Sequence, residues 1–353
     1  MDKKITYHEQ TTRDNTLKLR NVLATLPGFT RDYFRAIEPN TSAKTRISYV
    51  YDIRLFFKFL CGSNPYFANK GDITEIRLDD LEQLQPLDIE EYMEYLKYYK
   101  DNDGVIHTNN ERGLHRKLAA LRSFYHYYYK RELIKNDPTV IVDLPKLHKR
   151  EIVRLDIDEV AALLDYVEHG GDEMTGMKKV YFDKNKTRNL ALFTLLLGTG
   201  IRVSECVGLD LEDLDFKNNR IKIIRKGGKE DYVYFGDEVS EALYDYYAER
   251  KTISTKEGHE HAFFLSVQKR RMTVQAVENL VTDCAKHVTT IKHITPHKLR
   301  STYGTNLYRE TGDIYLVAEV LGHNDVNTTR KHYAAMEEER KRRAASAVKL
   351  RKD

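Results

Sequence analysis

Apolar residues in the first 145 positions recur at helical spacing. One amphipathic segment spans 42–60 and a second spans 88–99. A third, 111–133, carries the clearest stripe, in which successive members are three or four residues apart: Leu114, Leu118, Leu121, Tyr125 and Tyr128. At roughly 100° per residue these side chains share one helix face. The pattern predicts a helical domain over this part of the chain.

The pattern changes in the second half. Residues 156–167 predict a short amphipathic helix, and 188–197 predict a strongly apolar one that ends at the glycines of 198–200. Between them, 170–186 is polar and contains glycine, which favours a loop.

Two β-prone runs, 220–225 and 232–235, flank the glycine turn 226–229 and predict a hairpin. After position 237 helical patterns dominate again. The chain is therefore predicted to be mainly α with a small β-sheet.

Length and composition narrow the class of protein. The 353 residues are enough for two domains, 41% are hydrophobic, and the mean hydropathy is −0.61. The pattern predicts no membrane span and no signal peptide, so a cytoplasmic protein is expected. Cys61, Cys206 and Cys284 are far apart and predict neither disulfides nor a paired-cysteine metal site.

Positive charge is gathered into two stretches. The chain has 58 basic and 54 acidic residues, a net charge of only +4. Residues 112–150 nevertheless hold ten Lys and Arg against three acids, and 330–353 hold nine against four. Such segregation is typical of a protein that binds a polyanion, although solvated helix faces give a similar count.

Two basic residues follow tight turns. Arg202 comes directly after the glycine turn and is expected to be partly buried, where it needs an anionic partner. An ion pair with Glu205 is the simpler structural explanation. Lys226 sits at the hairpin tip, where a lysine is ordinarily just exposed, but a tip can also reach into a groove and deliver a proton.

A third motif is shaped for a phosphate. Thr295 and Pro296 are typical of a helix N-cap and first helical position, so His297 and Arg300 share one face near the positive helix end. Downstream, Gly322 before His323 indicates a helix C-cap. Tyr333 taken alone is one of 24 tyrosines, most of which pack or lie on the surface.

Common cofactor and metal motifs are missing from the sequence. The segment 198–203 lacks the last glycine of a dinucleotide fingerprint, and 226–229 lacks the upstream glycine of a P-loop. There is no HExxH pair. We therefore expect metal-free chemistry with no cofactor.

Taken in order, these motifs resemble the tyrosine recombinase family, the phage-integrase type. The resemblance rests on TGIRVSE, the KGGK turn, HKLRSTYGT and LGHNDVNTTRKHY, and it covers most of the chain from about position 42. The size and two-part layout are most similar to an Xer recombinase that acts without a paralogue.

The resemblance implies a mechanism and a role for each residue. Tyr333 would attack a DNA phosphodiester and form a 3′-phosphotyrosyl link, and Lys226 would protonate the leaving 5′-oxygen. Arg202 and Arg300 would hold the non-bridging oxygens. His297 would assist proton transfer from the tyrosine, and His323 would hydrogen-bond the phosphate.

The resemblance also implies an organisation and partners. It predicts an extension (1–28), a helical DNA-binding domain (29–145), a linker (146–155) and a catalytic domain (156–353) with a tail helix from about 338. Double-stranded DNA at a recombination site would be bound by a homotetramer on two sites, with a septal DNA translocase as a further candidate partner and no membrane. The side chains expected on DNA phosphates are Arg46, Arg112, Arg116 and Arg122.

Some features depart from the family pattern. Residues 1–28 and the loops expected at 101–110 and 168–187 look extra, and Arg225 stands where glycine is commoner. The last point leaves either Lys226 or Lys229 as the proton donor.

Several functions remain open at this stage. The leading one is resolution of chromosome dimers at a dif-like site, and the nearest alternative is the integrase of a mobile element with the same chemistry. A catalytically inactive DNA-binding protein and a type IB-like topoisomerase are further alternatives.

Overall fold

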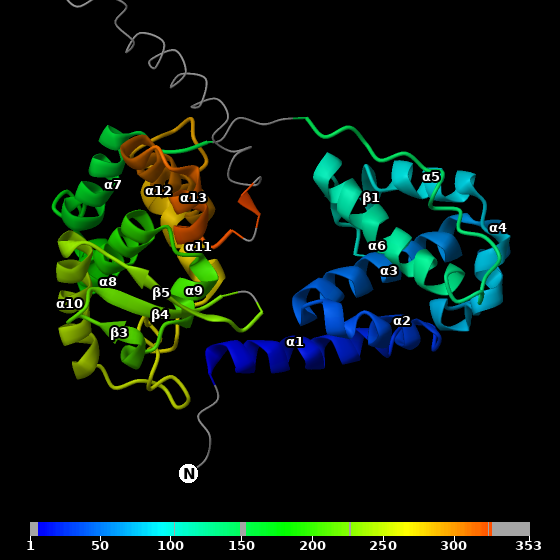
Figure 1. Ribbon diagram of the computed structural model, residues 1–353, viewed down its shortest axis with the longest axis horizontal. Helices are drawn as coiled ribbons and strands as arrows, with labels where there is room; N and C mark the ends of the chain where they lie inside the picture. Colours follow the sequence, from blue (N-terminus) through cyan, green and yellow to red (C-terminus); the bar gives the residue numbers. More distant parts are fainter. Residues whose placement is uncertain (1–5, 102, 149–152, 226, 324, 327–353) are drawn as a thin grey trace, which may run out of the picture. The chain divides into compact units, whose positions relative to one another are not determined.

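The computed structural model describes residues 6–101, 103–148, 153–225, 227–323 and 325–326. The chain divides into two compact units, Met1–Arg150 and Glu151–Asp353 (Figure 1). Each unit has helices as its main elements and one small antiparallel sheet, which confirms the predicted fold class.

The first unit is a group of helices around an aromatic core. Its helices are α1 (Tyr7–Leu23), α2 (Thr30–Ala36), α3 (Ala43–Ser63), α4 (Pro65–Ala68), α5 (Pro86–Tyr95) and α6 (Glu111–Tyr129), with short 3-10 turns at Glu38–Asn40, Ile73–Glu75 and Leu78–Gln83. A two-stranded ribbon joins α5 to α6 and consists of β1 (Tyr98–Lys100) and β2 (Ile106–Thr108).

Helix α6 forms as its periodicity predicts. The Asn110 side chain accepts a hydrogen bond from the Gly113 N–H at 3.0 Å and caps the first turn. All five members of the predicted stripe are buried, and Phe124 joins them at 0% exposure. The apolar face of α6 therefore forms one wall of the core, against α2 and α3.

The N-terminal segment is helical and belongs to this core. Thr6 and Glu9 form a reciprocal capping box at the start of α1. Leu19 and Val22 are buried, and α1 packs along α3. The segment expected to be an extension thus supplies part of the core of the first unit.

The second helix and the loop after it differ from the prediction. The helix expected over 88–99 ends at Tyr95, because Tyr98 pairs with Thr108 in the β ribbon. The segment 101–110 is accordingly not all loop, since it contains β2.

The second unit is built around one long helix. Helix α8 (Gly176–Thr199) packs against helices on several sides (Figure 1). The other helices are α7 (Ile157–His169), α9 (Val203–Gly208), α10 (Asp237–Thr252), α11 (Val274–Ala285), α12 (Pro296–Thr311) and α13 (Ile314–Val320), with a 3-10 turn at Leu211–Asp213.

The loop predicted over 170–186 is wrong for most of its length. Helix α8 begins at Gly176 and runs through the polar stretch into the apolar one. Once the apolar turns are packed, each further residue adds a hydrogen bond without a new nucleation cost, so polar residues extend the helix. The helix ends as predicted, because Gly200 adopts the left-handed conformation with φ 61°.

The predicted hairpin is present and gains a third strand. Strands β4 (Arg220–Ile224) and β5 (Glu230–Tyr234) pair antiparallel, with Ile224 opposite Glu230. The sequence pattern missed β3 (Leu214–Asp215), which pairs with the other edge of β4. Two residues are too few to show an alternation.

None of the helices in the described part of the chain is both long and apolar enough to cross a membrane.

The aromatic core of the first unit makes a stability prediction. Phe124→Ala should lower the free energy of unfolding by about 3–5 kcal/mol, because a fully buried ring that contacts Tyr33, Phe57 and Tyr128 is replaced by a cavity. Denaturant unfolding measures this loss. The control is Tyr129→Ala on the same helix, whose side chain is exposed and should change stability by under about 0.5 kcal/mol. Equal effects of the two variants would contradict this packing.

Candidate functional site

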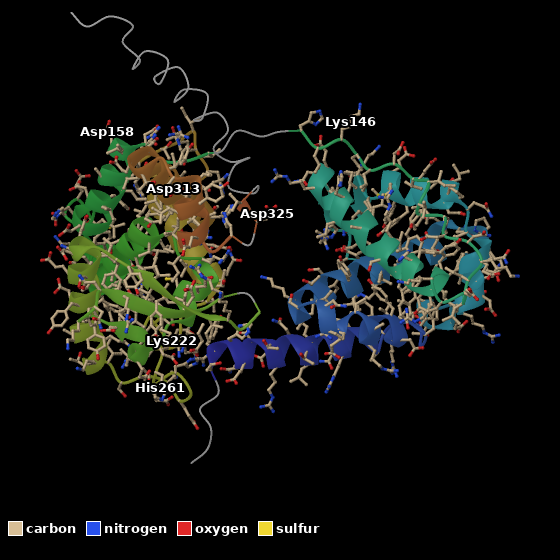
Figure 2. All side chains as sticks on the ribbon, in the orientation of Figure 1. Lys146, Asp158, Lys222, His261, Asp313 and Asp325 are labelled. Atoms are coloured by element: carbon tan, nitrogen blue, oxygen red, sulfur yellow. The ribbon has the colours of Figure 1, made fainter. Side chains whose placement is uncertain are left out.

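Three of the predicted site residues lie where separate elements of the second unit meet. Arg202 is the N-cap of α9, Arg300 lies in the first turns of α12, and His323 follows α13. Figure 2 labels Asp313, the N-cap of α13, and Asp325, which lies beyond the C-terminal end of that helix.

The end of α13 is shaped by one glycine. Gly322 has φ 59°, and its N–H donates to the Glu319 carbonyl at 2.8 Å. The His323 N–H donates to the Ala318 carbonyl at 2.9 Å. These two bonds form a Schellman cap, which turns the chain sharply and leaves the carbonyls of 320–322 to other donors.

Three arginines donate to those three successive carbonyls. Arg225 Nη2 donates to Val320 O at 3.1 Å, and Arg202 Nη2 donates to Gly322 O at 2.9 Å. Arg300 Nη2 donates to Leu321 O between them, and its Nη1 donates to Gly200 O at 2.6 Å. We call Arg202, Arg225 and Arg300 the guanidinium cluster. A helix C-terminus suits it, because the carbonyl ends carry partial negative charge.

Glu205 braces two members of the guanidinium cluster. Its Oε1 accepts from Arg202 Nη1 at 2.8 Å, and its Oε2 accepts from the Arg202 backbone N–H at 2.9 Å. Arg225 Nη1 lies 3.5 Å from the same Oε2. The Arg202–Glu205 pair expected from the sequence therefore exists, and it extends to a second arginine.

The members of the cluster differ in their access to solvent. The Arg202 side chain is 35% exposed, whereas Arg225 and Arg300 are buried. His323 is half-buried, and His297 is exposed on α12, one turn before Arg300. Cationic and imidazole groups thus border solvent in front of buried arginines, an arrangement that can hold an anion.

Two predicted site residues, Lys226 and Tyr333, lie outside the described residues, as does the tail helix expected from about 338. Lys229, the alternative proton donor, is exposed, and its carbonyl accepts from the Arg225 N–H at 2.8 Å. Of the predicted site residues, the structure brings Arg202, Arg300 and His323 together at the end of α13.

Both units match known families. Residues 153–340 match the phage integrase family, and residues 29–132 match the phage integrase N-terminal SAM-like domain. The chain is 31% identical to tyrosine recombinase XerS of Streptococcus pyogenes over 351 residues, which covers 92% of this chain and 96% of the relative. It is also 31% identical to tyrosine recombinase XerC of Caldanaerobacter subterraneus, over 85% of this chain and 80% of the relative.

The chain belongs to the tyrosine recombinase family, the phage integrases. Members of this family are enzymes that cleave and rejoin DNA at specific sites, and so is this protein.

Solved structures share the fold. One is XerH recombinase bound to a palindromic difH substrate, with a TM-score of 0.60 and 19% identity over 86% of this chain and 79% of that one. Another is the Tn1549 transposon integrase with a circular intermediate DNA, with a TM-score of 0.62 and 18% identity over 87% of this chain and 98% of that one. The same fold thus occurs in a recombinase and in a transposon integrase.

Two other nucleophiles near the recombinase site are disfavoured. Burial raises the pKa of the Cys206 thiol, next to Glu205, so this thiol stays protonated. Tyr303 lies on α12 against Gly200, and burial raises the pKa of its phenol. Neither is suited to attack a phosphate at neutral pH.

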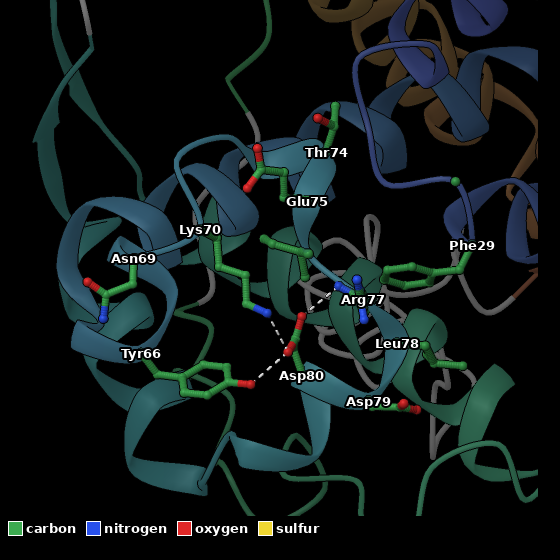
Figure 3. Close-up of a pocket in the computed structure, with 12 residues that line it drawn as sticks. Phe29, Tyr66, Asn69, Lys70, Thr74, Glu75, Arg77, Leu78, Asp79 and Asp80 are labelled. Atoms are coloured by element: carbon green, nitrogen blue, oxygen red, sulfur yellow. Dashed lines mark hydrogen bonds and ion pairs between the residues drawn. The ribbon is translucent and has the colours of Figure 1, made fainter.

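A polar hollow in the first unit has a structural explanation. It has a volume of about 1130 Å³ and is lined mainly by residues from 66–80 (Figure 3). Its carboxylate, Asp80, accepts hydrogen bonds from Lys70 Nζ at 2.6 Å, Tyr66 OH at 2.7 Å and the Arg77 N–H at 2.6 Å. Asp80 thereby caps the 3-10 turn at Leu78–Gln83. Across the described ranges no three His, Cys, Asp or Glu side chains gather as metal ligands.

The four arginines expected on DNA differ in their surroundings. Arg46 is buried and pairs with Glu38 at 2.6 Å, and Arg122 donates to the Thr139 and Val142 carbonyls at 3.2 and 2.5 Å. Arg116 is exposed and pairs with Asp52, and Arg112 is exposed. Arg112 and Arg116 are therefore the better placed of the four to meet a phosphate.

Sequence reasoning overlooked Arg225 as part of the site. A signal was present, because Ile221 and Ile223 occupy the buried face of β4 and Arg225 continues that alternation. An arginine on a buried strand face needs partners of opposite charge or carbonyl groups.

The brace at Glu205 makes a second stability prediction. Glu205→Gln should lower the free energy of unfolding by about 3 kcal/mol, because it leaves buried guanidinium charge without its carboxylate. Denaturant unfolding measures the change. Glu212→Gln is the control, since that side chain is 57% exposed in its pair with His261. A Glu205→Gln protein as stable as the control would show that the carboxylate charge is not needed.

Proposed function

We propose that this protein is an Xer-type recombinase that resolves chromosome dimers at a dif-like site, through a 3′-phosphotyrosyl intermediate. The similarity to XerS over nearly the full length of both chains supports the Xer assignment. The guanidinium cluster braced by Glu205 is the observation that carries the catalytic part of the proposal.

The scissile phosphate would sit against Arg202 and Arg300. Two guanidinium groups can bind its non-bridging oxygens and neutralise the charge that grows in the pentacovalent transition state. Arg202 is the more exposed of the two and would contact the phosphate first. The buried Arg300 would contribute a second positive charge. His323, which follows the same α13 cap, would donate a hydrogen bond to the phosphate.

Cleavage would transfer the phosphorus from one oxygen to another. The Tyr333 phenol oxygen forms a bond to phosphorus, and the bond from phosphorus to the 5′-oxygen breaks. His297 takes up the phenol proton, and Lys226 gives a proton to the leaving 5′-oxygen. Rejoining reverses these steps with the 5′-hydroxyl of another strand, so the reaction needs neither a metal nor a nucleotide.

The N-terminal unit would bind double-stranded DNA as the catalytic unit does. The match to the integrase SAM-like domain supports this role. Arg112 and Arg116 would contact phosphates, which position the protein without reading sequence. Four copies on two DNA sites would supply the strands for exchange, with a septal translocase as a candidate regulator.

The nucleophile has a direct test. Tyr333→Phe should bind a site duplex as the wild type does but form no covalent protein–DNA adduct, because only the attacking oxygen is removed. A nicked suicide duplex traps the adduct, which denaturing gel electrophoresis then detects. Tyr303→Phe is the matched control and should retain adduct formation. An adduct that persists in Tyr333→Phe would refute the assignment.

The biological substrate has a separate test. The protein should form the adduct on a dif-like sequence from the chromosome that encodes it, and not on the ends of mobile elements in that chromosome. The suicide-duplex assay compares the two sets of DNA, with scrambled half-sites as the control. Cleavage confined to element ends would favour the integrase alternative, which the shared fold with the transposon integrase keeps open.

A further inference from the structure

We infer that Arg225 is a positioning residue, whose guanidinium fixes the turn carrying Lys226 against the end of α13 and against Glu205. The inference rests on the proposed role of Lys226 as the proton donor. It assigns a function to the arginine that stands where this family commonly has glycine.

The main chain of Arg225 forms the base of the turn. Its N–H donates to the Lys229 carbonyl at 2.8 Å, and its carbonyl accepts from the Gly228 N–H at 3.1 Å. These bonds continue the ladder of β4 and β5 past the pair of Ile224 and Glu230. Lys226 is the next residue along the chain and is joined to Arg225 by a peptide bond, so a displacement of Arg225 is passed on to it.

The rest of the turn provides little rigidity of its own. Gly227 and Gly228 have φ angles of 88° and 82° and are exposed. Among the described residues, a Cβ added to either glycine would meet no heavy atom within 4 Å other than those of the glycine and its chain neighbours. Two adjacent glycines also lose the most conformational entropy when ordered. An anchor at the base therefore has a large effect on where the turn lies.

The Arg225 side chain is such an anchor, because it joins three elements. Nε donates to Asp231 Oδ2 on β5 at 3.0 Å, and Nη2 donates to Val320 O on α13 at 3.1 Å. Nη1 lies 3.5 Å from Glu205 Oε2 on α9. The residue is only 8% exposed, so its charge-assisted contacts with Glu205 and Val320 O are shielded from water.

The contact with α13 is also sterically tight. A Cβ added to Gly322 would lie 2.7 Å from the Arg225 Cζ atom, and nearer than 3.0 Å to two of its nitrogens. The guanidinium thus rests directly on the Schellman cap that positions His323. Movement of the hairpin toward α13 is blocked by this contact, and movement away breaks the bond to Val320 O.

Arg225 is placed to hold the turn and not to bind the phosphate. It is shared between the two carboxylates Glu205 and Asp231, and its side chain is 10% exposed against 35% for Arg202. Loss of Arg225 should consequently impair proton delivery more than phosphate binding.

A substrate that needs no proton donor separates these two effects. In a suicide duplex whose 5′-bridging oxygen is replaced by sulfur, the leaving thiolate has a conjugate acid of far lower pKa than an alcohol. The experiment measures single-turnover adduct formation on the ordinary duplex and on the sulfur duplex, at saturating protein. The variants are Arg225→Gln, Lys226→Ala and Lys229→Ala.

The expected pattern is selective. Lys226→Ala should lose about 10²–10⁴-fold on the ordinary duplex and recover on the sulfur duplex, as removal of a general acid does. Arg225→Gln should lose roughly 10–100-fold on the ordinary duplex, because a misplaced donor is less effective, and stay within about threefold of wild type on the sulfur duplex. Lys229→Ala should resemble wild type on both.

Arg220→Gln is the matched control. Arg220 is the first residue of β4, at the end of the strand remote from Arg225. It pairs with Asp215 at 2.9 Å and lies over the Tyr232 ring. It should cleave both duplexes at the wild-type rate. If Arg225→Gln does not fold, Asp231→Asn replaces it, because this 44% exposed carboxylate supports only the hairpin side of Arg225. We expect a loss of about 3–10-fold for Asp231→Asn, on the ordinary duplex alone.

The outcomes distinguish this inference from the proposed function. One outcome would overturn the positioning role alone. In it the sulfur duplex restores the cleavage rate of Lys226→Ala, while Arg225→Gln loses the same fraction of its rate on both duplexes. An ordinary-duplex rate unchanged in Arg225→Gln, or in Asp231→Asn where that variant replaces it, would overturn it as well. Failure of the sulfur duplex to rescue Lys226→Ala would overturn the donor assignment, and the positioning role would fall with it.

Discussion

The catalytic unit depends on how one helix ends. The Schellman cap after α13 leaves three successive carbonyls facing outward, and each accepts a hydrogen bond from a different arginine. Arg202 is the N-cap of α9, Arg225 directly follows β4 and Arg300 lies in α12, so a single turn of backbone aligns three separate elements. Gly322 is essential to this arrangement, because its φ of 59° and the adjacent guanidinium both exclude a side chain.

Burying cationic side chains has an energetic cost that this arrangement offsets. A desolvated guanidinium is strongly unfavourable unless carboxylates and carbonyls replace its water. Glu205, Asp231 and the α13 carbonyls do so while leaving three arginines in excess of two carboxylates. The remaining positive potential suits a phosphodiester, whose charge increases in the transition state. The interactions that stabilise the fold here also prepare the site for its substrate.

The first unit shows why counting basic residues along the sequence overestimates the positive charge available to bind DNA. The basic stretch that begins at Arg112 is met by acids from other parts of the chain. Asp52 on α3 accepts from both Arg116 and Lys117. Arg122 donates to carbonyls of the segment that follows α6. Part of the apparent surplus is therefore used in packing, and the exposed fraction is what remains for DNA.

Local patterns in the sequence determined the elements and the order of the chemical motifs. The stripe on α6, the glycine that ends α8, the β4–β5 hairpin and the Arg202–Glu205 pair all follow from interactions within a few residues. Tertiary structure decided the features that depend on contacts between residues distant in the sequence. It extended α8 through a polar stretch, added β3, and made Arg225 a partner of both Glu205 and the α13 carbonyl at Val320. The physical reason is that periodicity shows which face of an element is buried, while the partner on that face is chosen by elements distant in the chain.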